Sequence, residues 1–172
     1  MIHRPNPALI IGLGNAEKKY FRTYHNVGHL FIDALSVNPE LRIANLKILK
    51  NDGFMNTSGR FVTKSVQENN VPLDRVLIVH DDSDLELGTY KFSFGSGAAG
   101  HHGIENVIDA LKTKGFWRLR IGIRKKPAGL IAIIAGFRKA GSFVLRPIST
   151  KDQKILDAIF QKSIAEIISM TA

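Results

Sequence analysis

The chain has 172 residues, of which 44% are hydrophobic and 23% are charged, as is ordinary for one globular domain with a single core. Disorder is a poor hypothesis for a chain of this composition. Membrane insertion is also a poor hypothesis, because the longest apolar runs, at 8–13 and 130–135, are far shorter than the roughly 20 residues that span a bilayer. The net charge of +9 favours a polyanionic partner, and the absence of cysteine excludes disulfides, thiol catalysis and cysteine-based metal sites.

The first third of the chain alternates β-like runs with helical periodicity, which predicts an α/β fold. Leu9 to Ile11 opens a buried strand that ends in Gly12-Leu13-Gly14-Asn15. Apolar residues spaced i, i+3, i+4 predict a helix over residues 26–36. The pattern then continues with a strand over 46–50, a turn over 51–53 and a helix over 59–68.

The clearest strand lies near the middle of the chain, over residues 75–79. Its nearly continuous apolar run is typical of a strand buried on both faces, and it ends at His80-Asp81-Asp82. Further along, the glycine-rich loop 95–100 leads to a helix that starts at His101-His102. The remaining elements are strands over 89–94 and 117–123 and an amphipathic helix over 155–168. Together they predict one α/β domain over residues 1–172, with a mixed, mostly parallel twisted sheet flanked by helices.

Polar residues collect where ligands bind in open α/β sheets, outside the carboxyl ends of the strands. Asn15 follows the first strand, Asp81 follows the clearest strand, and His101 follows the glycine loop. His25 precedes the first helix, and Asn56 lies between a strand and a helix. Taken singly, each is more simply a turn, a cap or a surface group. Together they would hold an imidazole in one tautomer and orient a water or a carbonyl.

Two other chemistries are disfavoured by the spacing. Gly12-Leu13-Gly14 resembles the start of a dinucleotide fingerprint, but Glu17 stands where the third glycine is needed and no Walker-type run is present. A metal site is disfavoured because the nearby acidic and imidazole residues form no tight ligand motif. These residues are His80, Asp81, Asp82, Asp84, His101 and His102.

Four segments together carry a family resemblance. They are Ile11-Gly12-Leu13-Gly14-Asn15 with Tyr20 and Tyr24-His25-Asn26-Val27-Gly28; Phe54-Met55-Asn56-Thr57-Ser58-Gly59; Val79-His80-Asp81 with Asp84-Leu85; and Gly100-His101-His102-Gly103 with Arg118-Leu119-Arg120-Ile121-Gly122-Ile123. Their order and spacing over residues 9–124 resemble the bacterial-type peptidyl-tRNA hydrolase family. Any one segment is weakly specific, whereas the whole series is highly specific.

The resemblance implies an enzyme that hydrolyses the ester between a peptide, or an N-blocked amino acid, and the 3′ ribose of tRNA. It implies that His25 is the general base and that Asp81 orients it. It also implies a set of substrate-binding residues, namely Asn15, Tyr20, Met55, Asn56, His101 and His102. Tyr20 would support the crevice, and Met55 would shape the pocket. No metal and no organic cofactor is implied.

The implied partner is peptidyl-tRNA, bound through its phosphate backbone, with Lys91 and Arg120 as phosphate contacts. Further basic candidates for this surface are Arg118, Arg124, Lys125, Lys126, Arg138 and Lys139. Relatives lead us to expect a monomer without a membrane partner, and ribosome association is a further expectation. The absence of cysteine and of an apolar leader ahead of residue 8 fits a bacterial cytoplasm or a mitochondrial matrix.

Departures from the family pattern keep a second hypothesis open. His102 stands where the family has Asn, and Ser93 stands where a basic residue is expected. The apolar segment 130–135 is either a buried strand or an exposed docking patch. A catalytically weakened tRNA- or ribosome-binding relative is therefore the alternative to an enzyme, and a nucleotide-dependent enzyme is a distant third.

Overall fold

The computed structural model describes residues 4–39, 46–125 and 143–171. Its centre is a five-stranded sheet with the strand order β2-β1-β3-β5-β4. The strands are β1 (Leu9–Gly12), β2 (Lys47–Lys50), β3 (Val76–Glu86), β4 (Tyr90–Phe94) and β5 (Trp117–Arg124). Only β4 runs antiparallel to its neighbour, β5, within these ranges. The predicted mixed, mostly parallel sheet is confirmed.

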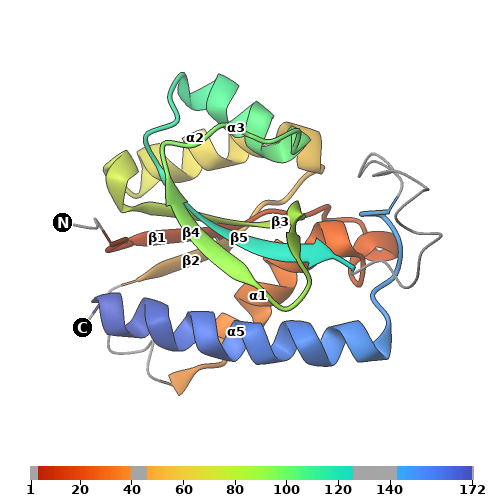
Figure 1. Cartoon of the computed structure of the whole chain (residues 1–172). Coiled ribbons are helices and arrows are strands. Elements are labelled where there is room, and N and C mark those ends of the chain that lie inside the picture. The colour runs from red at the N-terminus through yellow and green to blue at the C-terminus, as the bar shows by residue number, and fades with distance from the viewer. Residues whose placement is uncertain (1–3, 40–45, 126–142, 172) are drawn as a thin grey trace.

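Helices cover both faces of the sheet, as Figure 1 shows. In the part of the chain that the structure describes, the α-helices are α1 (Val27–Ser36), α2 (Ser58–Glu68), α3 (His102–Leu111) and α5 (Thr150–Thr171). α2 and α3 lie on one face, over a core that contains Val62, Ile78 and Val107. α1 and α5 lie on the other, over a core that contains Phe31 and Phe160. The layers thus bury each face of the predominantly parallel sheet, as such sheets require.

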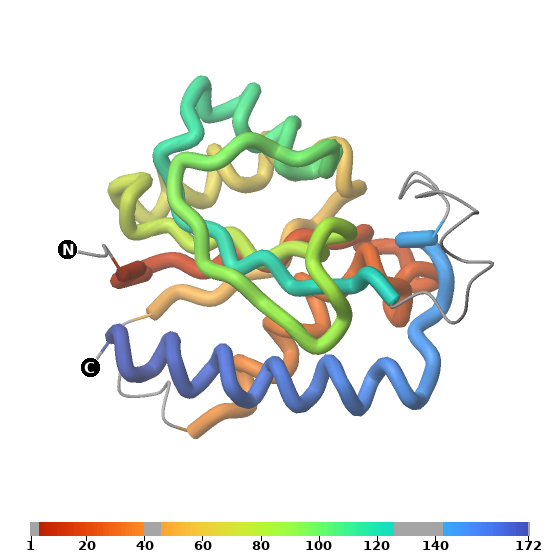
Figure 2. The backbone as a smooth tube through the Cα atoms, viewed as in Figure 1, coloured from red at the N-terminus to blue at the C-terminus, as the bar shows by residue number. Residues whose placement is uncertain are grey.

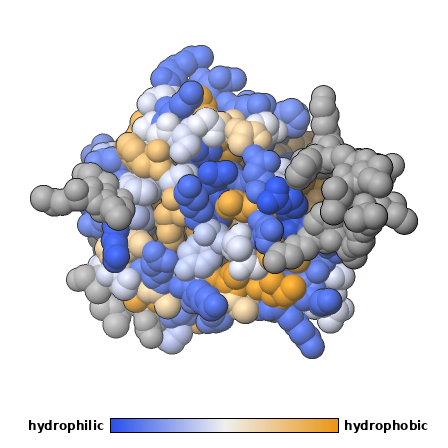
Figure 3. Space-filling model, viewed as in Figure 1, coloured by the Kyte–Doolittle hydropathy of each residue, from blue (hydrophilic) through white to orange (hydrophobic). Residues whose placement is uncertain are grey.

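Short 3₁₀ helices within the described ranges join these elements, namely η1 (Lys18–Tyr20), η2 (Tyr24–Asn26), η4 (Met55–Thr57) and η5 (Leu73–Arg75). Residues 143–148 run beside residues 22–25, a segment that overlaps the start of η2, as Figure 2 shows. The predicted apolar segment 130–135 and the basic residues Lys126, Arg138 and Lys139 lie outside the described residues. On the face drawn in Figure 3, hydrophobic residues are interspersed among hydrophilic ones. None of the helices in the described ranges is both long and apolar enough to cross a lipid bilayer.

β3 extends well beyond its predicted end. The apolar run predicts a strand that stops at His80-Asp81-Asp82, whereas β3 continues to Glu86. β5 remains paired with it through Asp82, and pairing resumes at Glu86 after a register shift. The predicted end was wrong because hydrogen bonding to the neighbouring strand, and not the extent of the apolar run, determines where a strand ends. Asp81 therefore projects from a central strand, and its position is fixed by the ladder with β5.

The start of α1 lies unusually close to the sheet at Gly28. A Cβ atom on this residue would lie 2.4 Å from the carbonyl oxygen of Leu13 and 2.5 Å from that of Val79. Both contacts are with backbone, which cannot move aside without disturbing β1 and β3. The absence of a side chain thus brings η2 and His25 against the carboxyl ends of these two strands.

We expect Gly28→Ala to lower the free energy of unfolding by about 3 kcal/mol, because the added methyl group overpacks a rigid backbone crossing. Gly97→Ala is the matched control, since a Cβ atom there meets nothing within 4 Å. Its effect should stay within about 1 kcal/mol. Urea unfolding followed by circular dichroism measures both, and equal costs for the two variants would contradict the close approach at Gly28.

Candidate active site

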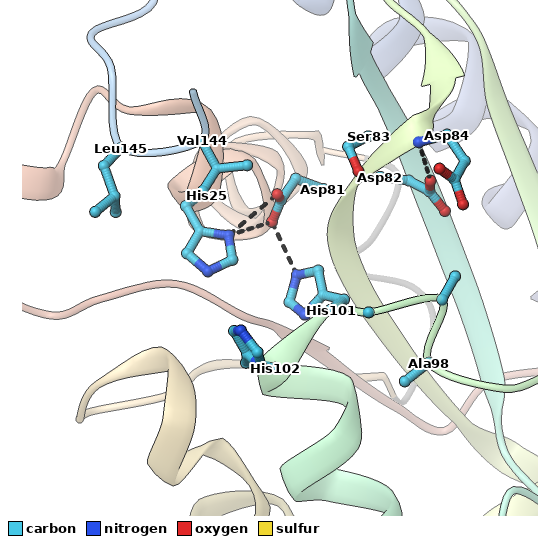
Figure 4. A pocket seen from close by; sticks show the side chains of 12 residues that line it. His25, Asp81, Asp82, Ser83, Asp84, Ala98, His101, His102, Val144 and Leu145 are labelled. Atoms are coloured by element: carbon cyan, nitrogen blue, oxygen red, sulfur yellow. Dashed lines mark hydrogen bonds and ion pairs between the residues drawn. The ribbon is translucent and has the colours of Figure 1, made fainter. Parts of the chain in front are cut away.

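A cavity of about 710 Å³ opens beside the carboxyl-terminal half of β3. Its walls come from segments far apart in the sequence, as Figure 4 shows: η2 contributes His25, β3 contributes Asp81, and the end of the glycine loop contributes His101. Val144 and Leu145 form an apolar side next to His25. The cavity therefore lies where ligands bind in α/β sheets.

Asp81 accepts hydrogen bonds from two imidazoles, drawn as dashed lines in Figure 4. Nδ1 of His25 lies 2.9 Å and 3.1 Å from its two carboxylate oxygens, and Nε2 of His101 lies 3.0 Å from Oδ1. The Asp81 residue is only 2% exposed. An ionised carboxylate only accepts hydrogen bonds, so each facing ring nitrogen carries a proton. In the neutral His25 ring, the basic nitrogen is then Nε2.

The surroundings shift both pKa values. Burial raises the pKa of the Asp81 carboxyl, but His101 and His25 together lower it to well below its usual range. Burial lowers the pKa of His25, while the negative charge and the hydrogen bond of Asp81 raise it by more, so the net pKa lies above the ordinary value. Asp81 thus stays ionised near neutral pH and stabilises the imidazolium form of His25.

His101 is held at both of its ring nitrogens. Nδ1 accepts a hydrogen bond of 3.2 Å from the backbone N–H of Ile104, which makes His101 the N-cap of α3. The proton of the neutral ring therefore sits on Nε2, which faces Asp81. The side chains of His25, Asp81 and His101 place their ligand atoms within 4.8 Å of one another. A metal ion at Nε2 of His101 would move the ring proton to Nδ1 and break the cap of α3, so the set fits a metal poorly while this cap is in place.

His80 forms a buried support behind this cluster. Its Nδ1 donates to the backbone carbonyl of Asp81 at 2.7 Å, and its ring meets that of His101 edge-on with centroids 4.7 Å apart. Burial lowers the pKa of His80 well below its ordinary value, and the neighbouring His101 lowers it further. A neutral ring therefore packs against His101 without adding a charge near Asp81.

The C-terminal part of the chain contacts and stabilises the segment that carries His25. The backbone N–H of His25 donates to the carbonyl of Val144 at 2.7 Å. The buried hydroxyl of Tyr24 donates to Asp152 in the first turn of α5, and Nζ of Lys125 lies 2.6 Å from the same carboxylate. These contacts fix the chain at Tyr24 and at the backbone of His25.

Two buried amides clamp the loop after β1. Asn51 bonds both the N–H and the carbonyl of Gly14 at 2.8 Å, and Asn26 does the same for Asn15 at 2.9 Å. Oδ1 of Asn15 in turn accepts a bond of 2.9 Å from the N–H of Met55. Each side-chain amide bonds the N–H and the carbonyl of one residue, as a neighbouring strand would, so the buried backbone groups of this irregular loop have partners.

The other predicted substrate residues do not all line the cavity that contains His25. His102 does, with its side chain 81% exposed and Nδ1 3.0 Å from Glu105. Met55 is buried under the first turn of α3, where a Cβ atom on Gly103 would lie 2.4 Å from its sulfur. Asn56 is exposed and lines a second cavity of about 690 Å³ beside α2 and α3. Tyr20, in η1, lies under the ammonium group of Lys19.

The predicted phosphate contacts differ in accessibility. Lys91 on β4 is exposed and lies in register with Arg120 on β5. Nε of Arg120 donates to Asp82 at 2.6 Å, so this guanidinium is already paired. The prediction of Arg118 as a surface cation was wrong, because the residue is 2% exposed and its Nη1 donates to the carbonyl of Gly97. Ser93 is buried in register with Arg118, where a lysine would place a second cation.

Several residues of the site escape sequence reasoning. Val144 and Leu145 line the cavity, and Asn51 fixes the loop that carries Asn15. No local pattern marks these residues, since an apolar pair and a turn Asn are common everywhere. Only Asn26 has a signal, because it directly follows His25 in a matched segment.

A buried carboxylate that orients an imidazole is the arrangement of a general-base site. Among the described residues, no hydroxyl group is hydrogen-bonded to that imidazole. The model of the peptidyl-tRNA hydrolase family matches residues 9–172. The chain therefore belongs to the peptidyl-tRNA hydrolase family.

Named relatives agree with the family match. The chloroplastic peptidyl-tRNA hydrolase of Arabidopsis thaliana is 37% identical over 178 residues, which cover 94% of this chain and 59% of that protein. The peptidyl-tRNA hydrolase of Nocardia farcinica is 34% identical, over 91% of this chain and 86% of that protein. The crystal structure of the Acinetobacter baumannii peptidyl-tRNA hydrolase superposes with a TM-score of 0.81 at 24% identity, covering 98% of this chain and 90% of the other, which shows the shared fold.

We expect Asn51→Ala to lower the free energy of unfolding by about 1–3 kcal/mol, because it leaves the buried backbone groups of Gly14 without partners. Asn69→Ala is the matched control. It removes one bond, from Nδ2 to the carbonyl of Ser65, at the partly buried end of α2. Its cost should stay below about 1 kcal/mol. Thermal and urea unfolding compare the two, and a smaller loss for Asn51→Ala would count against the clamp.

Proposed function

We propose that this protein hydrolyses the ester between a peptide, or an N-blocked amino acid, and the 3′ ribose of tRNA, with His25 as the general base. Membership of the peptidyl-tRNA hydrolase family supports the reaction. The observation that carries the role of His25 is its geometry: Nδ1 is bonded to the buried Asp81, and Nε2 has no partner among the described residues. An oriented base facing an open cavity can take a proton from water.

The reaction then proceeds without a covalent enzyme intermediate. Nε2 of His25 removes a proton from a water molecule as its oxygen attacks the ester carbonyl. Asp81 stabilises the imidazolium that forms, and the imidazolium returns the proton to the departing 3′ oxygen. The products are a free peptide carboxylate and tRNA. One general base accelerates the reaction by about 10²–10⁴-fold, and the positioning of substrate and water supplies the rest of the rate enhancement.

The remaining site residues support this chemistry in two ways. We assign direct substrate contact to His102, which lines the exposed rim of the cavity, and to His101 beneath it. Asn15 and Met55 hold the wall under α3, since they bond to each other and Met55 packs below Gly103. Tyr20 and Asn56 stay predictions as substrate contacts, because they lie outside the lining of this cavity within the described residues.

Binding of tRNA is proposed to be led by its phosphates. The net charge of +9 supplies the attraction, and the exposed Lys91 is the stronger candidate contact, because Arg120 is already paired with Asp82. The alternative, a tRNA- or ribosome-binding relative with weak activity, is disfavoured because a binder has no need of a buried carboxylate on an imidazole. Monomeric state, ribosome association and the predicted compartment, a bacterial cytoplasm or mitochondrial matrix, stay predictions, and the named relatives include bacterial and chloroplastic proteins.

His25→Ala should abolish release of an N-acetyl-aminoacyl group from tRNA, with a loss of about 10²-fold or more, because the other imidazole on Asp81, that of His101, already uses its second nitrogen to accept from Ile104. The variant should unfold at the same urea concentration as the wild type to within a few tenths molar, which separates chemistry from folding. Retained turnover in a folded variant would reject His25 as the base.

Asp81→Asn should lower the maximal rate and move the acidic limb of the pH–rate profile to lower pH. The sign follows from the charge: the carboxylate favours imidazolium and raises the pKa of His25, so its removal lowers that pKa. Steady-state rates between about pH 5 and 9 measure the limb. An unmoved or upward-moved limb would contradict the assigned pairing.

Affinity for tRNA should fall as salt rises, since each neutralised phosphate releases condensed counterions. Lys91→Ala should reduce the slope of log Kd against log salt by about one unit. Lys64→Ala is the matched control, because Lys64 is an exposed lysine of α2 that pairs with Glu68. Fluorescence anisotropy with labelled tRNA measures both slopes, and equal slopes for the two variants would remove Lys91 from the interface.

A further inference from the structure

His101 and His25 share one acceptor, the carboxylate of Asp81. Their donor nitrogens lie 3.0 Å and 2.9 Å from the same oxygen, Oδ1. The two rings lie close, with centroids 5.0 Å apart and a tilt of 43°. We propose that His101 is a positioning residue that acts through Asp81, fixing the carboxylate and limiting how strongly His25 holds a proton. This inference rests on the proposed role of His25 as the base.

The donor role of His101 follows from the hydrogen bonds at both of its ring nitrogens. Its Nδ1 accepts from the backbone N–H of Ile104, which closes the first turn of α3. Protonation of Nδ1 would break this cap, and loss of the Nε2 proton would break the bond to Asp81. His101 therefore serves as a neutral N–H donor, with one tautomer selected by the helix.

A neutral donor on Asp81 has a predictable effect on His25. The hydrogen bond from His101 withdraws negative charge from the carboxylate, so Asp81 stabilises the imidazolium form of His25 less than a lone carboxylate would. The pKa of His25 is then raised, but by less than Asp81 alone would raise it. His25 thus remains largely unprotonated and available as a base near neutral pH.

The other charged and titratable groups around the cluster are engaged elsewhere. On β3, the imidazole of His80 donates to a backbone carbonyl, and Asp82 accepts from Arg120 on β5. Arg118 on β5 donates to the glycine loop, and His102 on α3 pairs with Glu105. Asp84 is exposed on the cavity rim. Among the described residues, only the two imidazoles bond the Asp81 carboxylate.

The test is an NMR titration of the His25 ring protons in the free protein, with His25→Ala used to assign the resonance. His101→Asn keeps the cap of α3, because Asn is a favoured N-cap residue, but its amide is too short to reach Asp81. We expect the pKa of His25 to rise by about one unit in this variant. His101→Gln offers Asp81 a longer neutral N–H donor and should return the pKa toward the wild-type value.

His102→Asn is the matched control, since it makes the same change one residue along at a ring that pairs with Glu105 and not with Asp81. It should leave the pKa of His25 unchanged. An unchanged pKa in His101→Asn, or an equal rise in His102→Asn, would overturn the inference. A rise that His101→Gln leaves in place would also overturn it, because the effect would then come from loss of the ring and not of the donor.

Kinetics separates this inference from the proposed function. If both hold, the acidic limb of kcat/KM for His101→Asn moves to higher pH together with the NMR titration. If the NMR pKa rises and the limb stays, the coupling through Asp81 stands and His25 is rejected as the base. A rise in KM with neither pKa nor limb displaced would show simple substrate contact by His101 and overturn the positioning role.

Discussion

The site depends on one buried negative charge, the carboxylate of Asp81. An isolated carboxylate at 2% exposure would be protonated or strongly destabilising, because burial penalises the charged form. Two imidazole N–H groups offset that penalty, and each is held by a different part of the chain. The same two bonds that keep Asp81 charged also fix the tautomers of His25 and His101. The charge of Asp81, the tautomers of the two imidazoles and the geometry of the site thus all follow from these two hydrogen bonds.

Each partner of Asp81 is positioned by the backbone around it. η2 carries His25 and is secured by residues 143–148 and by the contact between Tyr24 and Asp152. Helix α3 holds His101 through its own first turn, and the glycine loop before it is bonded to the buried Arg118. Because all of these supports are rigid elements or buried hydrogen bonds, the imidazoles are oriented before any substrate arrives. Pre-orientation of this kind is what general-base catalysis by a single residue needs.

The departures from the family pattern acquire physical explanations. Ser93 faces the buried Arg118 across the β4–β5 pair, so a cation at that position would meet an existing buried charge. His102 is exposed and paired with Glu105, which places a titratable rim group where an amide is expected. Asn51, in a turn that sequence patterns leave featureless, also accepts from the buried His29 at 2.8 Å. The loop after β1 is therefore stabilised by a network of buried hydrogen bonds.

The sequence by itself determined the succession of strands and helices along the chain, the mostly parallel sheet and the family. It could do so because strand alternation, helical spacing and turn residues are local signals. It also singled out His25, Asp81 and His101 as separate residues. The pairing of His25 with Asp81 was already implied by the family resemblance, whereas tertiary structure decided that His101 bonds the same carboxylate, that Arg118 turns inward, and that Asn56 lies in another cavity. It also decided where β3 ends. These outcomes depend on strand pairing and on contacts such as that between Gly28 and the carbonyl of Val79, which join residues distant in sequence and leave no mark in local composition.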